Sequence, residues 1–388
     1  MDRLKELALL TYDAYGPFGL ALIVITAILF GVQIYYYIRI YAAIPKYKND
    51  MRPQTGPDTP GISVIVPMED DFLYIDETLP LMLTQAYDEY EVVIVYIGNN
   101  QEFAETLEML SEAHPKLSMT RIKQHPLFPI SNKMALNVGI KAAKYDYVII
   151  TTPDAKPLSS RWIPLMAKGF SKGDIVLGYC EVEQTPGLAG KMIRTSQMMC
   201  GARYLSAAIE KHPFGGVLQN TGFAKRLYFE NRGFGFLNMN IGEEDLFMQR
   251  IFDGDNVSVV MHPRATVRRK CWGGMRWWYK ERKARTHSYK YYPLAAKNFV
   301  EWEIGSRALF YFSTLAMIVF LPPELKIFAA VLLVARYAVV LRSMNKIAKR
   351  LGETGLSGTY FIYDMFSPAA DALISIAHKL RPDKEIWR

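Results

Sequence analysis

Cysteine is scarce in this chain of 388 residues, and neither an internal repeat nor a low-complexity tract is evident. The three cysteines, Cys180, Cys200 and Cys271, have no zinc-binding spacing and are odd in number. The sequence therefore gives no indication of a disulfide framework or a zinc knuckle. It favours a reducing, cytosolic location for the region that contains these residues.

A clear signal peptide is lacking, although residues 18–38 form an apolar run of about 21 residues, long enough to span a bilayer. Gln33 is its only strongly polar residue. Acidic residues precede the run and no small-residue cleavage site follows, which weakens the signal-peptide alternative. Tyr35 and its two neighbours suit a membrane interface, and several basic residues come next. The positive-inside rule therefore places the following domain in the cytoplasm.

Two further apolar runs, residues 308–321 and 327–341, are separated by Pro322 and Pro323. Each has about 15 residues, which is short for a span, and Arg336 interrupts the second. We expect a helical hairpin that returns to the cytoplasm; a buried or re-entrant helix pair is the alternative. Residues 361–380 fit either an interfacial helix or another short span.

Bulk composition fits a membrane-anchored globular protein, since 50% of the residues are hydrophobic while the mean hydropathy is near zero. The formal net charge is +8, and much of the excess falls between Arg264 and Lys290. Such a balance suits nucleic acid, anionic lipid or an anionic substrate. The nearby apolar hairpin makes us expect lipid and no nucleic-acid partner.

Between the apolar regions, apolar strands alternate with amphipathic helices, which predicts an α/β domain with a mainly parallel sheet. The expected strands are residues 61–67, 91–96, 147–150 and 257–261, and the expected helices are 79–86, 103–114, 132–143 and 244–252. Ligands bind at the carboxyl ends of such strands. We therefore expect residues 67–71, 97–100 and 151–156 to share one rim.

Four motifs follow one another in this region: SVIVP at 63–67, NKMALN at 132–137, NTGFAKRLYF at 220–229 and GEED at 242–245. Their order and spacing resemble the membrane-bound family 2 glycosyltransferases with a GT-A fold, from about residue 63 to 288, with the flanking anchors included. The resemblance implies a nucleotide-sugar donor and a lipid-linked or saccharide acceptor. It also implies cell-surface polysaccharide synthesis at the cytoplasmic membrane, with possible assembly subunits as partners.

The resemblance assigns chemistry to two carboxylates. Asp154 matches the last aspartate of the family's D-x-D motif and would hold Mg²⁺ or Mn²⁺ against the departing diphosphate. Asp245 would be the general base of a single, inverting displacement, with Glu244 orienting it or the acceptor. Two structural alternatives are a loop cap at Asp154 and acidic residues that favour the dipole of a helix starting at Glu244.

Further residues are expected around the donor. Pro67 and Glu69 follow the first strand, Asn99 or Asn100 follows the second, and Lys133 opens a helix. All would contact the nucleotide-sugar, although Lys133 is equally a solvated lysine.

The remaining candidates are expected at the metal and at the diphosphate. His262 is a candidate second metal ligand or a structural histidine. Arg282 and Arg285 stand where the family has Q-x-x-R-W, so they would grip the diphosphate or face lipid on a basic amphipathic helix.

Three departures from the family pattern matter. Asn99 stands near the position of an aspartate pair, Thr152 replaces the first aspartate of D-x-D, and Arg282 and Thr286 replace two residues of Q-x-x-R-W. These changes favour transfer of a single sugar over processive synthesis. They also leave open a catalytically silent scaffold subunit of a polysaccharide assembly complex.

The expected domain organisation has four parts. They are an anchor at 1–52, a GT-A-like domain at 53–263, a basic aromatic interface region at 264–303, and a membrane hairpin with its tail at 304–388.

Overall fold

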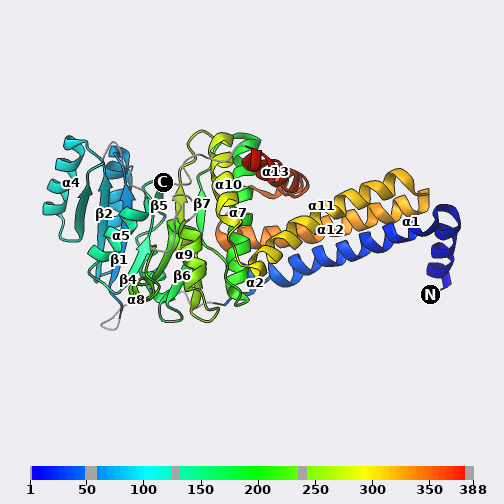
Figure 1. Cartoon of the computed structure of the whole chain (residues 1–388), viewed down its shortest axis with the longest axis horizontal. Helices are drawn as coiled ribbons and strands as arrows, with labels where there is room; N and C mark the ends of the chain where they lie inside the picture. The colour runs from blue at the N-terminus through cyan, green and yellow to red at the C-terminus, as the bar shows by residue number, and fades with distance from the viewer. Residues whose placement is uncertain (1, 49–58, 125–131, 235–242, 381–388) are drawn as a thin grey trace.

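The computed structural model describes residues 2–48, 59–124, 132–234 and 243–380, with the side chains of 2–15 and 243–245 outside that description. An α/β domain occupies one end of the molecule, and a long bundle of helices extends from it (Figure 1). The predicted fold class, a mainly parallel α/β domain with membrane-type helices before and after it, is confirmed.

The main sheet has seven strands within the described residues. In spatial order they are β3 (Leu117–Ile122), β2 (Tyr90–Ile97), β1 (Ile62–Met68), β4 (Tyr147–Ile150), β8 (Thr221–Ala224), β6 (Ile175–Gly178) and β9 (Val257–Val260). The first four are parallel, whereas β8 runs antiparallel to both β4 and β6. Strands β1 and β4 are almost entirely buried, which explains their continuous apolar sequence.

Short helices accompany this sheet. They are α3 (Leu79–Leu83) after a π-turn (Tyr74–Thr78), α4 (Gln101–Ala113), α5 (Asn132–Ala142), α6 (Trp162–Gly169), α8 (Lys225–Glu230) and α9 (Glu243–Ile251). Helix α5 packs closely on the sheet at Gly139, where an added Cβ would lie 2.6 Å from Cγ2 of Ile65. The predicted helix starting at Leu79 is shorter than expected, because Thr84 leaves the helical conformation.

A second sheet of three short strands lies next to the carboxyl end of β4. It contains β5 (Ala155–Pro157), β10 (Val267–Arg269) and β7 (Cys180–Val182). A 3-10 turn at Pro263–Ala265 precedes β10, and another at Leu218–Asn220 precedes β8 of the main sheet. In the antiparallel pairing of β10 with β5, Arg269 lies opposite Ala155. This register brings a basic residue beside the predicted D-x-D segment.

Three long helices form the bundle: α1 (Asp2–Tyr35), α11 (Leu294–Phe320) and α12 (Pro323–Leu351). A π-turn (Tyr36–Ile40) and α2 (Ala43–Lys46) follow α1. All three regions contain helices long and apolar enough to cross a membrane. The apolar runs at 308–321 and 327–341 are short, but polar flanking residues extend each into a longer helix. Both α11 and α12 therefore reach a spanning length.

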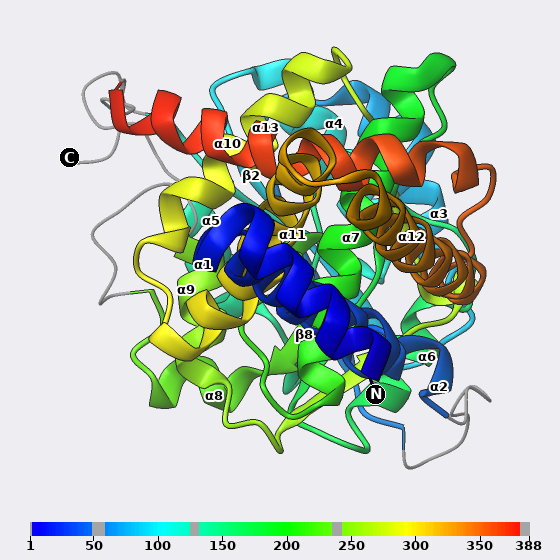
Figure 2. The same cartoon turned by 90° about the vertical axis from the view of Figure 1, so that its right-hand side faces the viewer.

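Three more helices join the bundle to the α/β domain: α7 (Gly187–Ile209), α10 (Met275–Tyr289) and α13 (Tyr360–Leu380), the last after a 3-10 turn (Ser357–Thr359). Helix α13 is not among the candidate spans and lies across the bundle direction (Figures 1 and 2). It buries Tyr363 and Asp364 while exposing Phe366 and Leu373. This arrangement favours the interfacial alternative for residues 361–380.

Candidate active site

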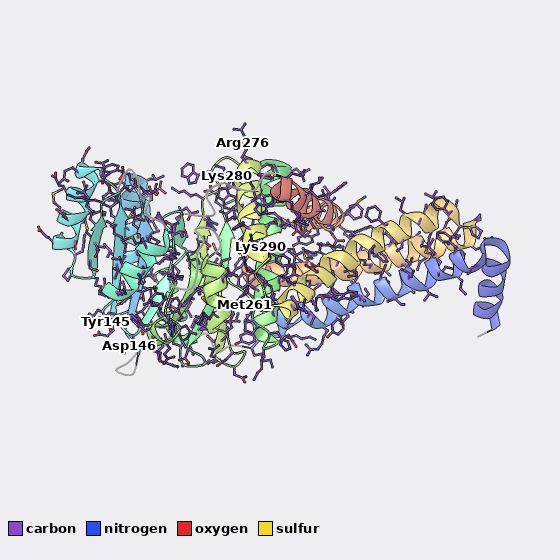
Figure 3. All side chains as sticks on the ribbon, in the orientation of Figure 1. Tyr145, Asp146, Met261, Arg276, Lys280 and Lys290 are labelled. Atoms are coloured by element: carbon purple, nitrogen blue, oxygen red, sulfur yellow. The ribbon has the colours of Figure 1, made fainter. Side chains whose placement is uncertain are left out.

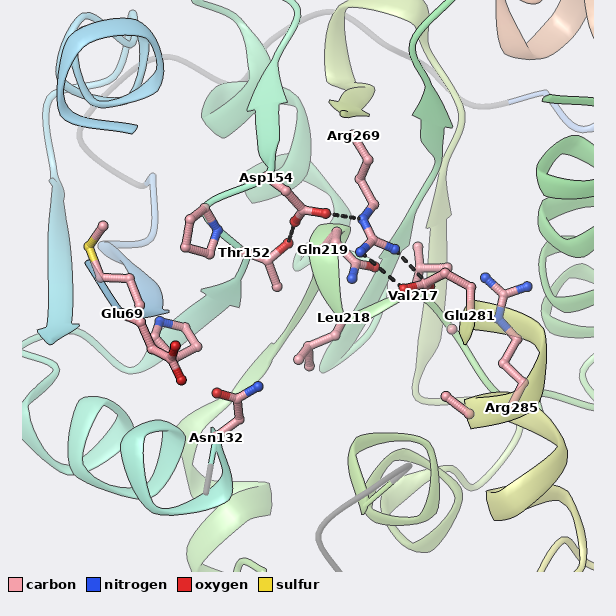
Figure 4. A pocket seen from close by; sticks show the side chains of 15 residues that line it. Glu69, Asn132, Thr152, Asp154, Val217, Leu218, Gln219, Arg269, Glu281 and Arg285 are labelled. Atoms are coloured by element: carbon pink, nitrogen blue, oxygen red, sulfur yellow. Dashed lines mark hydrogen bonds and ion pairs between the residues drawn. The ribbon is translucent and has the colours of Figure 1, made fainter. Parts of the chain in front are cut away.

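A cavity of about 470 Å³ opens at the carboxyl ends of β1 and β4, where the sequence predicted a ligand site (Figure 4). Its walls come from segments that are distant from one another in sequence. They include Pro67, Met68 and Glu69 after β1, Thr152, Pro153 and Asp154 after β4, Gly216, Val217, Leu218 and Gln219 before β8, Arg269 of β10, Glu281 and Arg285 of α10, and Asn132. Several polar groups therefore converge on one concave site.

Asp154 uses both of its carboxylate oxygens within this cavity. Oδ1 accepts a hydrogen bond from the Thr152 hydroxyl, and Oδ2 accepts one from Nε of Arg269 at 2.7 Å (Figure 4). The backbone reinforces the second contact, because the N–H of Lys270 donates to the carbonyl of Asp154 at 3.0 Å. The pairing of β10 with β5 thus sets the position of Arg269 against Asp154.

Arg269 is held from three sides, and only 10% of its side chain is exposed. Besides Asp154, it donates from Nη1 to Oε2 of Glu281 at 2.9 Å, and its guanidinium lies 5.1 Å from the centre of the Trp277 ring. Burial lowers the pKa of Arg269, but Asp154 and Glu281 outweigh burial and raise it overall. Burial likewise raises the pKa of Glu281, and Arg269 outweighs it so that the pKa falls below its ordinary value.

The sequence had placed Arg269 only within a basic stretch and had not singled out Glu281. Three-residue strands such as β5 and β10 carry no hydrophobic period, so their pairing could not be predicted. One sequence signal pointed to such a contact. Thr152 replaces the first aspartate of D-x-D, so the surroundings of Asp154 differ from those in the family pattern.

A buried amide supports the opposite wall of the cavity. Asn220 donates from Nδ2 to the carbonyls of Tyr179 and Ala265 at 2.7 and 2.9 Å, and it accepts from Nε1 of Trp162 at 2.9 Å. A buried side chain with these hydrogen bonds fixes its backbone. The buried hydrogen bonds of Asn220 therefore fix the position of residues 216–219, which directly precede it.

Four predicted residues meet in this cavity: Pro67, Glu69, Asp154 and Arg285. Lys133 is not among the lining residues, although its neighbour Asn132 is. Asn99 is exposed and donates to the carbonyl of Gln124 at 3.1 Å.

The other asparagine considered, Asn100, caps α4 by accepting from the N–H of Phe103 at 3.3 Å. Neither asparagine lines the cavity, so the structure does not place either one where it was expected to contact the nucleoside.

His262 and Arg282 also lie outside the lining of this cavity. Nδ1 of His262 accepts from the N–H of Arg264 at 3.0 Å, and burial together with nearby arginines lowers the pKa of His262. Arg282 donates from Nη1 to Ser196 at 2.9 Å and forms an ion pair with Asp371. The structure thus gives His262 a capping contact and makes Arg282 a link between α10, α7 and α13.

The predicted base Asp245 and its neighbour Glu244 lie in the first turn of α9, and their side chains are outside the described part of the chain. Their roles remain predictions.

A divalent cation is compatible with the cavity that contains Asp154. Three carboxylates line it, Glu69, Asp154 and Glu281, against two guanidinium groups, so a bound diphosphate would need added positive charge. The described residues contain no group of three or more His, Cys, Asp or Glu side chains placed to hold a metal. Magnesium often binds through one or two carboxylates together with substrate phosphates, and Asp154 can supply such a ligand.

A second cavity, of about 520 Å³, lies between α7, α10, α11 and α13. It shares Gly216 and Arg285 with the first cavity. Its walls combine apolar groups such as Ile304 with Arg203 and Tyr289, and α11 continues from it into the bundle. A mixed polar and apolar cavity therefore borders both the first cavity and a candidate membrane span.

The α/β domain has a GT-A-like fold, with membrane-type helices before and after it, as the sequence predicted. The family model of Glycosyl transferase family 21 matches residues 22–176, which include β1, β4 and Asp154. The matching model is thus that of family 21, whereas the motifs had suggested family 2. None of the curated proteins compared with the chain matches it in sequence.

Comparison with solved structures finds chains that are similar to this one, including the following two. One is the mannosyltransferase PcManGT from Pyrobaculum calidifontis, solved with GDP-Man and Mn²⁺. It is 16% identical, with a TM-score of 0.61 over 94% of this chain and 99% of that one. Residues 1–349 of S. aureus TarS are 14% identical, with a TM-score of 0.44 over 82% of this chain and 91% of that one. At such identities the likeness to PcManGT establishes the fold.

Proposed function

We propose that this protein is an inverting glycosyltransferase that moves one sugar from a nucleotide-sugar to a lipid-linked or saccharide acceptor at the cytoplasmic face of a membrane. The observation that carries the proposal is the pair of adjoining cavities. The first has Asp154 and two arginines at the carboxyl ends of parallel strands, and the second borders a candidate membrane span.

The first cavity is suited to the donor. The segment after β1, with Pro67 and Glu69, offers a surface for the nucleoside, and Arg269 and Arg285 offer guanidinium groups to the diphosphate. A divalent cation at Asp154 would supply a Lewis acid for the departing diphosphate, and PcManGT was solved with Mn²⁺ and a nucleotide-sugar. We propose Mg²⁺ or Mn²⁺ in this role.

Asp245 is proposed as the base of a single displacement. The acceptor oxygen attacks the anomeric carbon while the bond from that carbon to the diphosphate breaks. Asp245 takes the proton of the acceptor hydroxyl, and one displacement inverts the configuration at the sugar. A base of this kind contributes about 10²–10⁴ to the rate.

The second cavity favours a lipid-linked acceptor over a free saccharide. Its apolar groups can hold a hydrocarbon chain, while Arg203 and Tyr289 offer polar contacts to a headgroup. The shared lining residues, Gly216 and Arg285, would let that headgroup approach the donor. We propose that the acceptor enters from the membrane beside α11.

Exposed basic residues support a cytoplasmic orientation. Arg276 and Lys280 are exposed on α10, and Lys290 is exposed at its end (Figure 3). Lys346 and Lys349 are exposed near the end of α12. Basic residues near span ends favour the cytoplasmic side. A role in cell-surface polysaccharide synthesis, with partner subunits, fits an enzyme placed there.

Donor binding is the direct test. Purified protein in detergent is titrated with GDP, UDP and their sugar conjugates, with and without Mn²⁺, and stabilisation is read as a thermal shift. We expect stabilisation by one nucleotide class that depends on Mn²⁺ and is lost in Asp154→Asn. Asp174→Asn is the matched control, because that carboxylate pairs with Arg226 at the surface.

A catalytically silent scaffold is the second candidate, favoured by Thr152 in place of an aspartate and by the engagement of Asp154 with Arg269. Folded protein that responds to no nucleotide in the panel would support it.

A further inference from the structure

We propose that Arg269 blocks Asp154 in the nucleotide-free site, so that a divalent cation binds there only together with a nucleoside diphosphate. The inference rests on the proposed function, since it describes how the same site takes up its donor. It makes Arg269 a positioning residue that couples cation binding to nucleotide binding.

The first step of the argument is the engagement of Asp154. Its Oδ2 receives the Nε–H of Arg269 at 2.7 Å, and its Oδ1 receives the Thr152 hydroxyl. A cation must approach one of these oxygens to within about 2.0–2.6 Å. It would then stand beside a guanidinium group that is always charged. Thr152 is neutral, so it cannot offset this repulsion as an aspartate would.

The second step is that Arg269 cannot easily withdraw. Glu281 accepts from Nη1 at 2.9 Å and from Nη2 at 3.4 Å, and Trp277 lies under the guanidinium. The side chain is buried, so no solvent shell replaces these contacts if it moves. A cation that binds without nucleotide therefore meets a fixed positive charge beside Asp154, the carboxylate that follows β4 in the cavity lining.

The third step concerns the diphosphate. Arg269 has five N–H bonds, and three of them serve Asp154 and Glu281. Within the part of the chain that the structure describes, the two that remain, one on each Nη, can donate to phosphate oxygens. A diphosphate at this position would neutralise the guanidinium and add oxygen ligands for the cation. Nucleotide and cation would consequently strengthen each other's binding.

The test measures Mn²⁺ binding without turnover. Free Mn²⁺ is followed by electron paramagnetic resonance while the full-length protein in detergent is titrated, first alone and then with saturating GDP or UDP. Wild-type protein should bind Mn²⁺ at least about tenfold more tightly when the nucleotide is present. Without nucleotide, Arg269→Gln should bind Mn²⁺ at least about tenfold more tightly than wild type, because the positive charge beside Asp154 is gone.

Arg268→Gln is the matched control. It makes the same charge change one residue away, but Arg268 pairs with Glu181 outside the cavity, so Mn²⁺ binding should not change. Thr152→Asp is an independent variant that retains Arg269. Its added carboxylate should also raise the affinity for Mn²⁺ alone, which keeps the test valid if Arg269→Gln folds poorly.

The results separate this inference from the proposed function. If wild-type protein binds Mn²⁺ equally well with and without nucleotide, or if neither Arg269→Gln nor Thr152→Asp improves binding of Mn²⁺ alone, the inference is overturned even if sugar is transferred. If Mn²⁺ and GDP or UDP bind cooperatively and no nucleotide-sugar is ever consumed, the inference is supported and the proposed function is overturned.

Discussion

Arg336 of α12 and Asp364 of α13 form a two-point ion pair inside the helical part of the molecule, with both side chains about 1% exposed. Nη2 of Arg336 donates to Oδ1 of Asp364 at 3.1 Å and to Oε1 of Gln33 at 2.7 Å, which joins α1 to the pair. The arginine that seemed to interrupt an apolar run is thus a contact between helices. Charged residues within membrane segments are usually paired in this way.

We expect Asp364→Asn to destabilise the protein by about 3–5 kcal/mol, because it leaves the buried charge of Arg336 without its partner. Arg307 also contacts Asp364 and would lose an opposing charge. The measurement is the thermal or denaturant midpoint in detergent. The double variant Asp364→Asn with Arg336→Gln should be less destabilised than Asp364→Asn. A single variant as stable as wild type would contradict this view of the ion pair.

Asp245→Asn should lower the rate of sugar transfer by about 10²–10⁴ without weakening nucleotide binding, because it removes only the proposed base. The measurements are the turnover rate and the nucleotide dissociation constant for the purified variant. Glu243→Gln, two residues earlier, is the matched control and should retain activity. If both variants lose activity equally, the acidic residues stabilise the N-terminus of α9, and Asp245 is not the catalytic base.

Cys200 should be the cysteine that reacts first with N-ethylmaleimide in the folded protein. Burial raises the pKa of the Cys180 and Cys271 thiols, which lowers their reactive thiolate fraction, whereas Cys200 lines the second cavity, where a reagent can reach it. Mass spectrometry identifies the modified residue. Modification should reduce transfer to a lipid acceptor but leave nucleotide binding intact, and Cys200→Ala protein should be insensitive. Unaltered transfer after complete modification would argue against the second cavity as the acceptor route.

Glu281 should contribute a pH-dependent part of the stability. Its pKa is lowered in the folded protein because Arg269 outweighs burial, so its contribution is present above the ordinary value of 4.5 and is lost as the pH falls through the lower folded pKa. Glu281→Gln should therefore be less stable than wild type at pH 7, and the difference should shrink below about pH 4. Thermal midpoints between pH 7 and pH 3.5 measure it. A difference that does not depend on pH would contradict the ion pair with Arg269.

Much of the fold could be predicted from the sequence, because its strongest signals are local. The strand at Tyr147–Ile150 has the predicted bounds, and the helix starting at Asn132 ends one residue early. Buried parallel strands and long apolar helices are the segments in which hydrophobicity alone is informative. The antiparallel insertion of β8 was not predicted, since it depends on pairing with β4 and β6 across long sequence separations.

The site could be predicted only where a residue follows a strong strand. Pro67, Glu69 and Asp154 line the cavity because β1 and β4 end beside each other. Asn99 follows β2 in the same manner, but it is exposed, and its neighbour Asn100 caps α4. The second cavity depends on how four helices pack, which no local pattern specifies.

Transfer of labelled sugar into membrane lipid tests the central proposal most directly. Membranes containing wild-type protein, Asp154→Asn or Asp174→Asn are incubated with Mn²⁺ and a panel of labelled GDP- and UDP-sugars, and the lipid fraction is extracted and counted. We predict that one donor labels the lipid fraction with wild-type and Asp174→Asn protein, and that Asp154→Asn reduces this labelling by at least about a hundredfold. Labelling that is equal in all three membranes, or absent from all three although the protein is folded and inserted, would contradict the proposal.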